Sequence, residues 1–271
     1  MKQTGNLRKM KSELSEVVHY EIPLYNNTEP STTFNISSLI GKPIKITFAN
    51  NIHCVVTGKK IKKTYGEGMS WDAFKSSPMA VESIIRPELS QAHLGIGLRD
   101  LEWEIKHDCQ PHIVYLSLTS GLKVGVTRKT QIPTRWIDQG AHEAIILAET
   151  PYRQAAGLIE VALKKHISDR TNWRKMLTNI CDYNGSLSSS KKDLFSYLPV
   201  DLIEFFSKEN KITKINYPVK SYPEKIKSIK LDSNPIIEKQ LDGIKGQYLI
   251  FNDNTVLNIR SHSGYEITIE G

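Results

Sequence analysis

The chain has 271 residues, a length that accommodates one large domain or two modest ones, each with its own hydrophobic core. At 39% apolar and 24% charged residues, its composition is ordinary for a soluble globular protein, and no apolar run approaches the roughly 18 residues of a membrane helix. The formal net charge of +7 favours an anionic partner, with nucleic acid the first candidate.

The N-terminal region, residues 1–53, is predicted to combine a polar leader with a β-rich part. Residues 1–18 are polar and charged and lack the apolar centre of a signal peptide, so we expect a cytoplasmic protein without a membrane partner. Further on, short runs such as 33–36 and 43–48 alternate apolar and polar side chains, as half-buried strands do.

The central region is predicted to begin with a β-hairpin and a short helix. Two β-branched runs, 112–118 and 122–127, are joined by a turn that contains Gly121, a pattern typical of a hairpin. Pro133 then stands near the first position of a short helix, and Gly140 stands at its end.

A third strand and a longer helix follow. Residues 144–148 form an apolar run, and Thr150 is placed to cap a helix whose first residue is Pro151. The apolar residues of this helix recur at helical spacing and predict a buried stripe made of Ala155, Leu158, Ile159, Ala162 and Leu163. The order strand, strand, helix, strand, helix over residues 112–182 predicts one small α+β domain.

The C-terminal region, residues 183–271, is predicted to be a helical linker followed by a β-rich part. The serine-rich residues 185–190 suit a linker by composition, and a broken helix is expected over 193–209. Residues 246–269 contain three strand candidates. Because isolated hairpins are marginal in water, we expect the N- and C-terminal β-rich parts to pair as one small barrel or sheet.

A lysine-rich stretch with aromatic residues lies between the helical and the β-rich part. Residues 208–230 contain seven lysines together with Tyr217 and Tyr222. The tyrosine rings could stack bases while the lysines meet backbone phosphates. The alternative, which we favour, is a solvated connector.

Several phrases of the central region occur together and in order: HIVYL, LKVGVTR, QIPTRWIDQGA, RQAAGLIEVALKKH and DRTNW. They resemble the signature of an uncharacterised bacterial family named for a domain of unknown function, and the resemblance extends more weakly over most of the chain. A more distant resemblance, limited to residues 112–182, is to the GIY-YIG endonuclease superfamily.

Within the GIY-YIG resemblance, four residues stand at the positions of functional side chains. Tyr115 corresponds to the first tyrosine, Lys123 begins the second motif, Arg135 is the helix arginine and Glu160 is the metal-binding glutamate. Many members have a second tyrosine in place of Lys123, although one branch of the superfamily also has lysine there. The resemblance implies a small antiparallel sheet with flanking helices and metal-dependent cleavage of nucleic acid.

The chemistry of this reaction leaves two interpretations open. Hydrolysis of a phosphodiester requires stabilisation of charge on the phosphate and an activated water. One carboxylate such as Glu160 can hold Mg²⁺, which keeps several waters and takes phosphate oxygens as ligands. As the i,i+4 partner of Lys164, however, Glu160 fits a solvated helix face equally well. Lys123, with an ordinary pKa of about 10.4, is a poor base at neutral pH and favours phosphate binding over cleavage.

Nucleic-acid contacts are expected from four cations: Lys123, Arg128, Arg135 and Lys164. The planar fork of Arg135 suits a phosphate, although this arginine could instead pack beside Trp136. Tyr115 could orient or deprotonate water, or it could be a half-buried core residue with a local hydrogen bond. His112, before the tyrosine strand, is either an acid–base group or a structural hydrogen-bonding residue.

The segment 54–111 is predicted to be a degenerate zinc-ribbon-like module. The family resemblance implies CxxC pairs here, of which this chain keeps Cys54 and Cys109. The other corresponding positions hold Thr57, Ser70, Ala73, Ser83, Ser90 and Leu98. Because structural zinc requires four ligands of Cys or His type, we expect no zinc and, with Cys181, three reduced thiols. The alternative is a rearranged site made of His93, His107, Cys109 and His112.

The sequence thus predicts an α+β fold with a GIY-YIG-like central domain. The leading function is nucleic-acid binding, extended to Mg²⁺-dependent phosphodiester cleavage if the catalytic residues act as the resemblance implies. The alternative is a non-catalytic nucleic-acid or protein interaction module on a degenerate nuclease fold. The choice between DNA and RNA, the oligomeric state and the roles of Asp138, Gln139 and Asn172 are open at this point.

Overall fold

The computed structural model describes residues 1–271. The chain divides into two compact units: unit 1 comprises residues 1–75 and 216–271, and unit 2 comprises residues 76–215. The chain therefore leaves unit 1, forms unit 2 and returns to complete unit 1. None of its helices is both long enough and apolar enough to cross a membrane.

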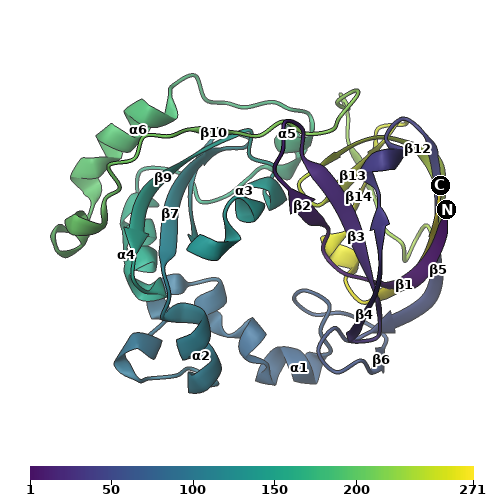
Figure 1. The fold of residues 1–271 in the computed structure, drawn as a ribbon, viewed down its shortest axis with the longest axis horizontal. Helices are drawn as coiled ribbons and strands as arrows, with labels where there is room; N and C mark the ends of the chain where they lie inside the picture. The colour runs from purple at the N-terminus through teal and green to yellow at the C-terminus, as the bar shows by residue number, and fades with distance from the viewer. The chain divides into compact units, whose positions relative to one another are not determined.

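Unit 1 is built on an 11-stranded sheet to which both ends of the chain contribute (Figure 1). β1 (Lys2–Leu7) pairs with β15 (Tyr265–Glu270), and β5 (Pro43–His53) pairs with both β15 and β12 (Ile236–Lys245), always antiparallel. The remaining strands are β2 (Lys11–Glu13), β3 (His19–Asn26), β4 (Glu29–Asn35), β6 (Lys60–Ile61), β11 (Lys227–Ile229), β13 (Tyr248–Phe251) and β14 (Thr255–Asn258). The predicted pairing of the two β-rich parts is confirmed.

The sheet of unit 1 is open, so of the two expected forms, a small barrel or a sheet, the structure has the sheet and no closed barrel. Its order is β11-β14-β13-β12-β5-β15-β1-β3-β2, with β4 on β3 and β6 on β5. The two end strands, β11 and β2, are three residues long, and such short edges offer little backbone for further pairing. The first residues, expected as a polar leader, include β1, which is held by its backbone pairing with β15 and β3.

Alternation along the strands places the core of unit 1 on one side of each strand. Tyr20, Ile22 and Leu24 of β3 are fully buried, as are Ile267 and Ile269 of β15. Short helical turns η1 (Ser37–Leu39) and η9 (Arg260–His262) and the first residues of α1 (Trp71–Ser76) complete this unit.

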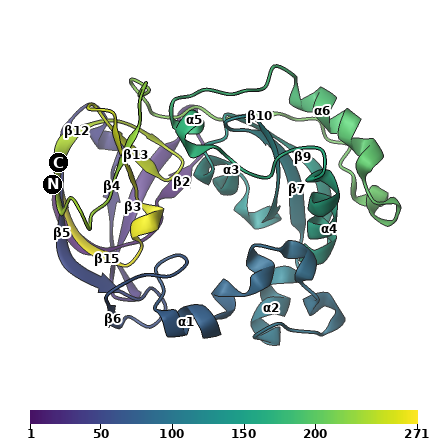
Figure 2. The same ribbon diagram turned by 180° about the vertical axis from the view of Figure 1, so that it is seen from behind.

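Unit 2 contains a second sheet, and all of its named strands are antiparallel. Its order is β10 (Thr213–Lys214), β9 (Glu143–Thr150), β7 (His112–Leu118) and β8 (Leu122–Arg128). Helix α3 (Thr134–Asp138) and helix α4 (Arg153–Leu163) lie on opposite sides of this sheet (Figures 1 and 2). The predicted order of hairpin, short helix, third strand and longer helix is therefore present in the structure. The mixed α+β class is likewise confirmed.

The remaining helices of unit 2 are short. They are α2 (Leu101–Asp108), α5 (Trp173–Leu177), α6 (Leu187–Leu194), η2 (Pro78–Ala80), η3 (Glu82–Ile84), η4 (Pro87–Leu89), η5 (Ala92–Leu94), η6 (Lys129–Gln131), η7 (Phe195–Tyr197) and η8 (Val200–Phe205). The serines expected as a linker begin α6, because the Ser186 side chain accepts from the backbone N–H of Ser189 and Leu187 is fully buried.

The buried face of α4 differs from the predicted apolar stripe. Leu158 is 43% exposed, whereas the charged residues Arg153 and Glu160 are buried. The reason is that α4 packs against η4 as well as the sheet: a Cβ on Gly157 would lie 2.2 Å from the backbone nitrogen of Glu88. A helix covered on two sides buries polar residues that a single apolar stripe does not reveal.

Candidate functional site

Tyr115 is held in place by the glycine that faces it across the hairpin. The two residues are directly paired between β7 and β8, so their side-chain positions share one face of the sheet. A Cβ on Gly125 would lie 2.6 Å from the Tyr115 hydroxyl oxygen and 2.7 Å from its ring carbon Cζ. The tyrosine ring can cross over β8 only because this position has no side chain.

Helix α3 supplies the partners of the buried tyrosine. The Tyr115 hydroxyl donates to the Gln139 side-chain oxygen at 3.0 Å, and the Trp136 ring meets the tyrosine edge-on with centroids 6.1 Å apart. Burial raises the pKa of the phenol, while the nearby positive charge of Arg135 works against this and the negative charge of Glu160 adds to it. The first helix after the hairpin therefore brings an arginine and an amide to the tyrosine.

Lys123 lies beside Tyr115 on the same face of the hairpin and is only 5% exposed. Burial lowers its pKa to about 8, assisted by the charge of Arg135 and opposed by that of Glu160. Its cross-strand partner is Ser117, whose hydroxyl is buried without a hydrogen-bond partner. A lysine in this state is charged at neutral pH but gives up its proton far more easily than an exposed one.

Glu160, on α4, is 7% exposed and lies near enough for its charge to influence the titration of Tyr115 and Lys123. Its carboxylate lies 3.3 Å from the Lys164 ammonium, which also lies 3.2 Å from Asp169. Burial raises the pKa of Glu160, whereas the charge of Lys164 lowers it. The predicted i,i+4 pair is thus present, but on a buried face of the helix rather than a solvated one.

The four side chains of the GIY-YIG resemblance therefore lie in one neighbourhood. We refer to Tyr115, Lys123, Arg135 and Glu160 as the Lys123 cluster. They come from β7, β8, α3 and α4, and the charges of Arg135 and Glu160 each influence the titration of both Lys123 and Tyr115. The cluster combines two cations, a phenol and a carboxylate, a set that can bind a phosphate and move a proton.

The structure does not bring Arg128 into this cluster. Alternation along β8 places Arg128 on the opposite face from Lys123, five residues further along the strand, which corresponds to about 16 Å. Burial lowers the pKa of Arg128, and the charge that opposes this is Asp108. Lys164, by contrast, belongs to the neighbourhood of the cluster through its ion pair with Glu160.

A metal ion fits the cluster only with ligands from outside the protein. The 271 residues contain no group of three or more His, Cys, Asp or Glu side chains arranged to hold a metal ion. Glu160 supplies one carboxylate, and Mg²⁺ retains several waters and takes phosphate oxygens readily. The donor set therefore suits a metal ion that binds together with a phosphate substrate, provided that the ion pair between Lys164 and Glu160 breaks.

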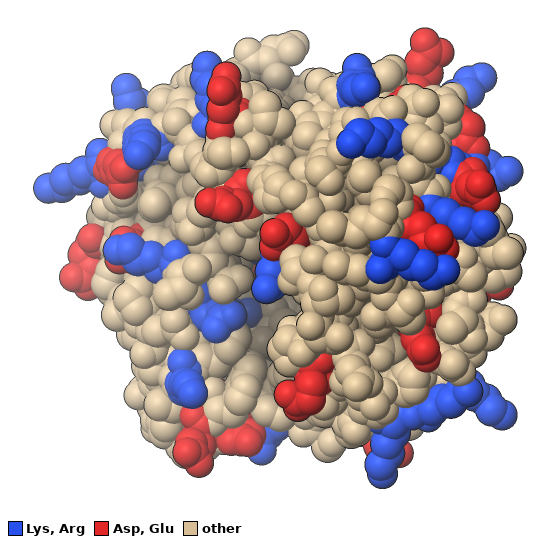
Figure 3. All heavy atoms as spheres, turned by 45° about the vertical axis from the view of Figure 1, so that its right-hand side comes forward, with Lys and Arg blue, Asp and Glu red and all other residues tan.

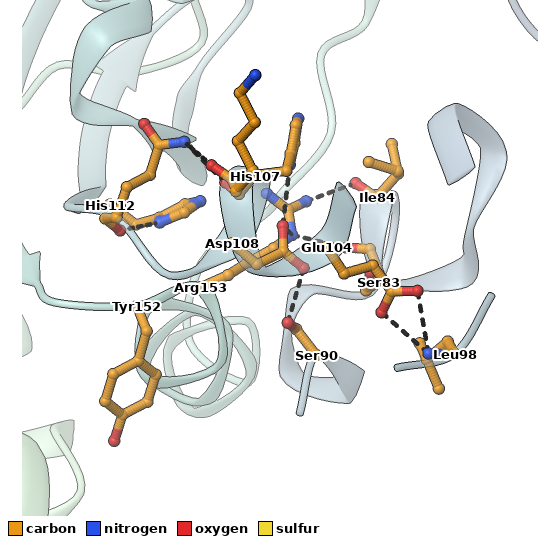
Figure 4. A network of polar contacts seen from close by, with 12 residues as sticks. Ser83, Ile84, Ser90, Leu98, Glu104, His107, Asp108, His112, Tyr152 and Arg153 are labelled. Carbon is orange, nitrogen blue, oxygen red and sulfur yellow. Dashed lines mark hydrogen bonds and ion pairs between the residues drawn. The ribbon is translucent and has the colours of Figure 1, made fainter. Parts of the chain in front are cut away.

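His112 belongs to a separate polar network, which Figure 4 shows. Its ring is fully buried, with Nδ1 2.7 Å from the Gln110 carbonyl oxygen and Nε2 without a partner. Burial lowers the pKa of His112 to about 4. At neutral pH the imidazole is uncharged and sealed from solvent, which agrees with the structural role of this residue rather than the acid–base role.

Asp108 is the centre of that network (Figure 4). Its carboxylate accepts from the Ser90 hydroxyl at 2.7 Å and lies 2.9 Å from the His107 ring. The Arg153 guanidinium, 3.8 Å from Asp108, donates to the carbonyl oxygen of Ser83 at 2.9 Å. Ser83 and Ser90, at two positions where the family resemblance implies cysteine, thus lie in a hydrogen-bonded network that ties η3 and α2 to α4.

A buried carboxylate organises the loop before α2 in the same segment. Glu104, fully buried, accepts from the backbone N–H groups of Leu98, Arg99 and Asp100 at 2.7 to 3.0 Å. A carboxylate that receives several backbone donors can fix a loop without a metal. These contacts account for the order of the loop at residues 98–100.

The residues around Cys54 do not suit zinc. Cys54 accepts from the Ser70 backbone N–H at 3.2 Å, and the Ser70 hydroxyl accepts from that of Ala73 at 3.2 Å. Burial raises the pKa of the Cys54 thiol, but a hydrogen bond from Thr57 and several backbone donors outweigh it and bring the value to about 7. One sulfur among Thr, Ser and Ala is not a tetrahedral zinc set.

The alternative zinc ligands have other partners. His93 stacks on Tyr152 with ring centroids 3.9 Å apart, and His107 stacks on Trp103 at 4.3 Å. Cys109 is exposed.

The tyrosines of the lysine-rich stretch pack within unit 1. The Lys245 ammonium, from β12, lies 5.3 Å from the Tyr217 ring centre and 5.1 Å from that of Tyr222. Lys245 is 1% exposed, so both rings help to bury a cation of their own unit. This arrangement supports the connector interpretation. On the face shown in Figure 3, basic and acidic side chains are interspersed.

Sequence reasoning missed several residues around the Lys123 cluster. Gln139, whose role the sequence left open, accepts the hydrogen bond from the Tyr115 hydroxyl, and the sequence patterns did not indicate Ser117 or Asp169. Ser117 could have been found from the hairpin register, since it lies opposite Lys123. Asp169, which follows α4 in a loop, gives no local signal of its contact with Lys164.

The fold and the cluster define a mixed α+β protein with a buried polar site on an antiparallel sheet. Residues 41–267 match the model of the family described as "Protein of unknown function (DUF2797)". This match spans most of the chain, and the chain belongs to that family. No curated protein matches it, and no solved structure matches it.

Proposed function

We propose that the chain binds nucleic acid at the Lys123 cluster and hydrolyses a phosphodiester there with the help of Mg²⁺. The observation that carries the proposal is that two buried residues on one face of the hairpin, Tyr115 and Lys123, are both influenced by the charges of Arg135 from α3 and of buried Glu160 from α4. Supporting it is the element order β7, β8, α3, β9, α4, which agrees with the GIY-YIG-like domain expected for residues 112–182.

Each residue of the cluster has a role that its environment permits. Arg135 presents a planar fork to two phosphate oxygens. Lys123 holds the phosphate in its charged form; with a pKa of about 8, its neutral fraction can also accept a proton from water. The lysine is thus a better base than its sequence position suggested. Tyr115, bonded to Gln139, positions the groups around it.

Glu160 is the residue that would hold the metal. When bound, Mg²⁺ would stabilise the charge that develops on the phosphate. Lys164 would then release Glu160 and keep its second ion pair, with Asp169. The burial of Glu160 strengthens its interaction with any cation that reaches it.

A second candidate is a non-catalytic nucleic-acid-binding module on the same fold. It is favoured by one observation, the ion pair in which Lys164 already neutralises Glu160. In that case the carboxylate orders two lysines that face the phosphate and takes no part in chemistry.

Replacement of Glu160 separates the two candidates. Glu160→Gln preserves shape and removes the charge, so a hydrolase should lose all Mg²⁺- or Mn²⁺-dependent cleavage of DNA and RNA oligonucleotides while still binding them. The matched control is Glu102→Gln, the same change at an exposed carboxylate of α2. Cleavage that survives Glu160→Gln would exclude the metal role of this residue. If the wild type binds oligonucleotides but cleaves none of them, the non-catalytic binding module is the function that remains.

A further inference from the structure

A hollow of about 800 Å³ opens next to the β7–β8 turn, outside the Lys123 cluster. Its wall is formed by the turn itself, by the segment between α4 and α5, by the first turn of α5, and by Asp182 and Tyr183 after α5. The volume lies in the range of small-ligand sites. Nothing in the periodicity of the sequence indicated it, because its wall is mostly loop.

The hollow combines cations with an aromatic platform. Trp173 is half-buried, and the guanidinium of Arg174 lies 4.3 Å from its ring centre. Arg170 also lines the hollow, and its side chain is 93% exposed. The one acidic residue of the wall, Asp182, is paired with Lys175. The wall therefore has an excess of positive charge beside a flat π-surface, the two features with which proteins hold single-stranded nucleic acid.

The wall is built rather than loosely placed. Thr119 and Thr171 hydroxyls lie 3.1 Å apart, and the Asn172 backbone N–H donates to the Ser120 hydroxyl at 2.8 Å. The Asn172 side chain in turn caps α5 by accepting from Arg174 and Lys175 backbone N–H groups. This is the structural role of the asparagine in the DRTNW phrase: it fixes the position of Trp173 against the turn.

The hollow adjoins the strand that carries Lys123. Ser168, which lines it, accepts from the backbone N–H of Val124 at 3.0 Å, immediately after Lys123. The next residue, Asp169, pairs with Lys164, the partner of Glu160. Residues 168 and 169 therefore lie between the Lys123 cluster and the hollow.

We propose that the hollow receives an unpaired base adjacent to the phosphate held at the Lys123 cluster, so that the substrate is a single-stranded or looped nucleic acid. This inference rests on the proposed function. The base stacks on Trp173, and Arg170 meets the neighbouring backbone phosphate. A continuous duplex keeps its bases stacked and paired and cannot supply one.

The test compares single-stranded and duplex oligonucleotides of about 12 nucleotides, a length within the range of known single-strand sites, bound to the full chain and followed by fluorescence anisotropy. The wild type should bind the single strand more tightly. Trp173→Leu should weaken single-strand binding by about tenfold and duplex binding by less than about twofold, since only a stacked base is lost. Trp71→Leu, at a tryptophan that is 49% exposed in α1, is the matched control and should change neither.

Arg170→Gln is the second variant, because an exposed side chain can be replaced without a cost in folding. It should reduce the slope of log affinity against log salt concentration for single-strand binding by the equivalent of about one phosphate contact. If the wild type binds nucleic acid and neither Trp173→Leu nor Arg170→Gln alters single-strand binding, the hollow is not a base site, while the proposed function stands. If the wild type binds neither oligonucleotide at low salt, the proposed function fails and this inference fails with it.

Discussion

Lys123 should make nucleic-acid binding depend on pH in a range where ordinary lysines do not titrate. Its pKa of about 8, against a usual 10.5, results first from burial and then from the charge of Arg135. The shift corresponds to about 3 kcal/mol between its charged and neutral forms. About a tenth of the lysine is neutral at pH 7 and about nine-tenths at pH 9.

The magnitude follows if only the charged lysine binds phosphate. Affinity for an oligonucleotide should then fall about tenfold between pH 7 and pH 9, approaching one decade per pH unit above the pKa. Anisotropy titrations at constant ionic strength measure this directly. Lys123→Arg keeps the charge throughout and should remove the pH dependence, whereas Lys165→Arg, at an exposed lysine after α4, should retain it.

Two results would refute this reasoning. One is a pH dependence that persists in Lys123→Arg, which would assign it to another group. The other is an NMR titration of the Lys123 side chain with a midpoint above about 10, the ordinary value, because burial would then not govern its charge.

Two further predictions concern the scaffold of the site. Gly125→Ala should lower the stability of the protein by about 1–3 kcal/mol in urea unfolding, because the new Cβ collides with the buried Tyr115 ring; Gly121→Ala, where a Cβ meets nothing within 4 Å, should be nearly neutral, and equal effects would contradict this account. His112 should make the fold acid-sensitive: the unfolded chain takes up its proton near pH 6.5 and the folded one only near pH 4, so stability is lost as pH falls through this window. The loss from pH 7 to pH 5 should be about 2 kcal/mol in urea unfolding and should largely vanish in His112→Phe.

Local signals in the sequence were sufficient for the elements that carry the site. The β-branched runs at β7 and β8, the turn between them and Gly140 after α3 each act over a few residues, which is the range over which backbone preferences operate. The N- and C-terminal pairing was also predictable, because neither end had enough strands to be stable by itself. Tyr115 and Gly125 face each other across the β7–β8 hairpin, and the tyrosine ring needs a glycine at that position.

Burial of charge was decided only by the tertiary structure. Glu160 belongs to the polar side of α4 by periodicity, yet it is buried because η4 and the loop after α4 cover that side, while apolar Leu158 is exposed. The low pKa of Lys123 has the same origin: it depends on neighbours from α3 and α4, which are remote in sequence. A sheet closes into a barrel only if its two edge strands pair with each other, and β11 and β2 do not. The residue type determines the chemistry of a side chain, but its desolvation and the charges around it come from residues that only folding brings near.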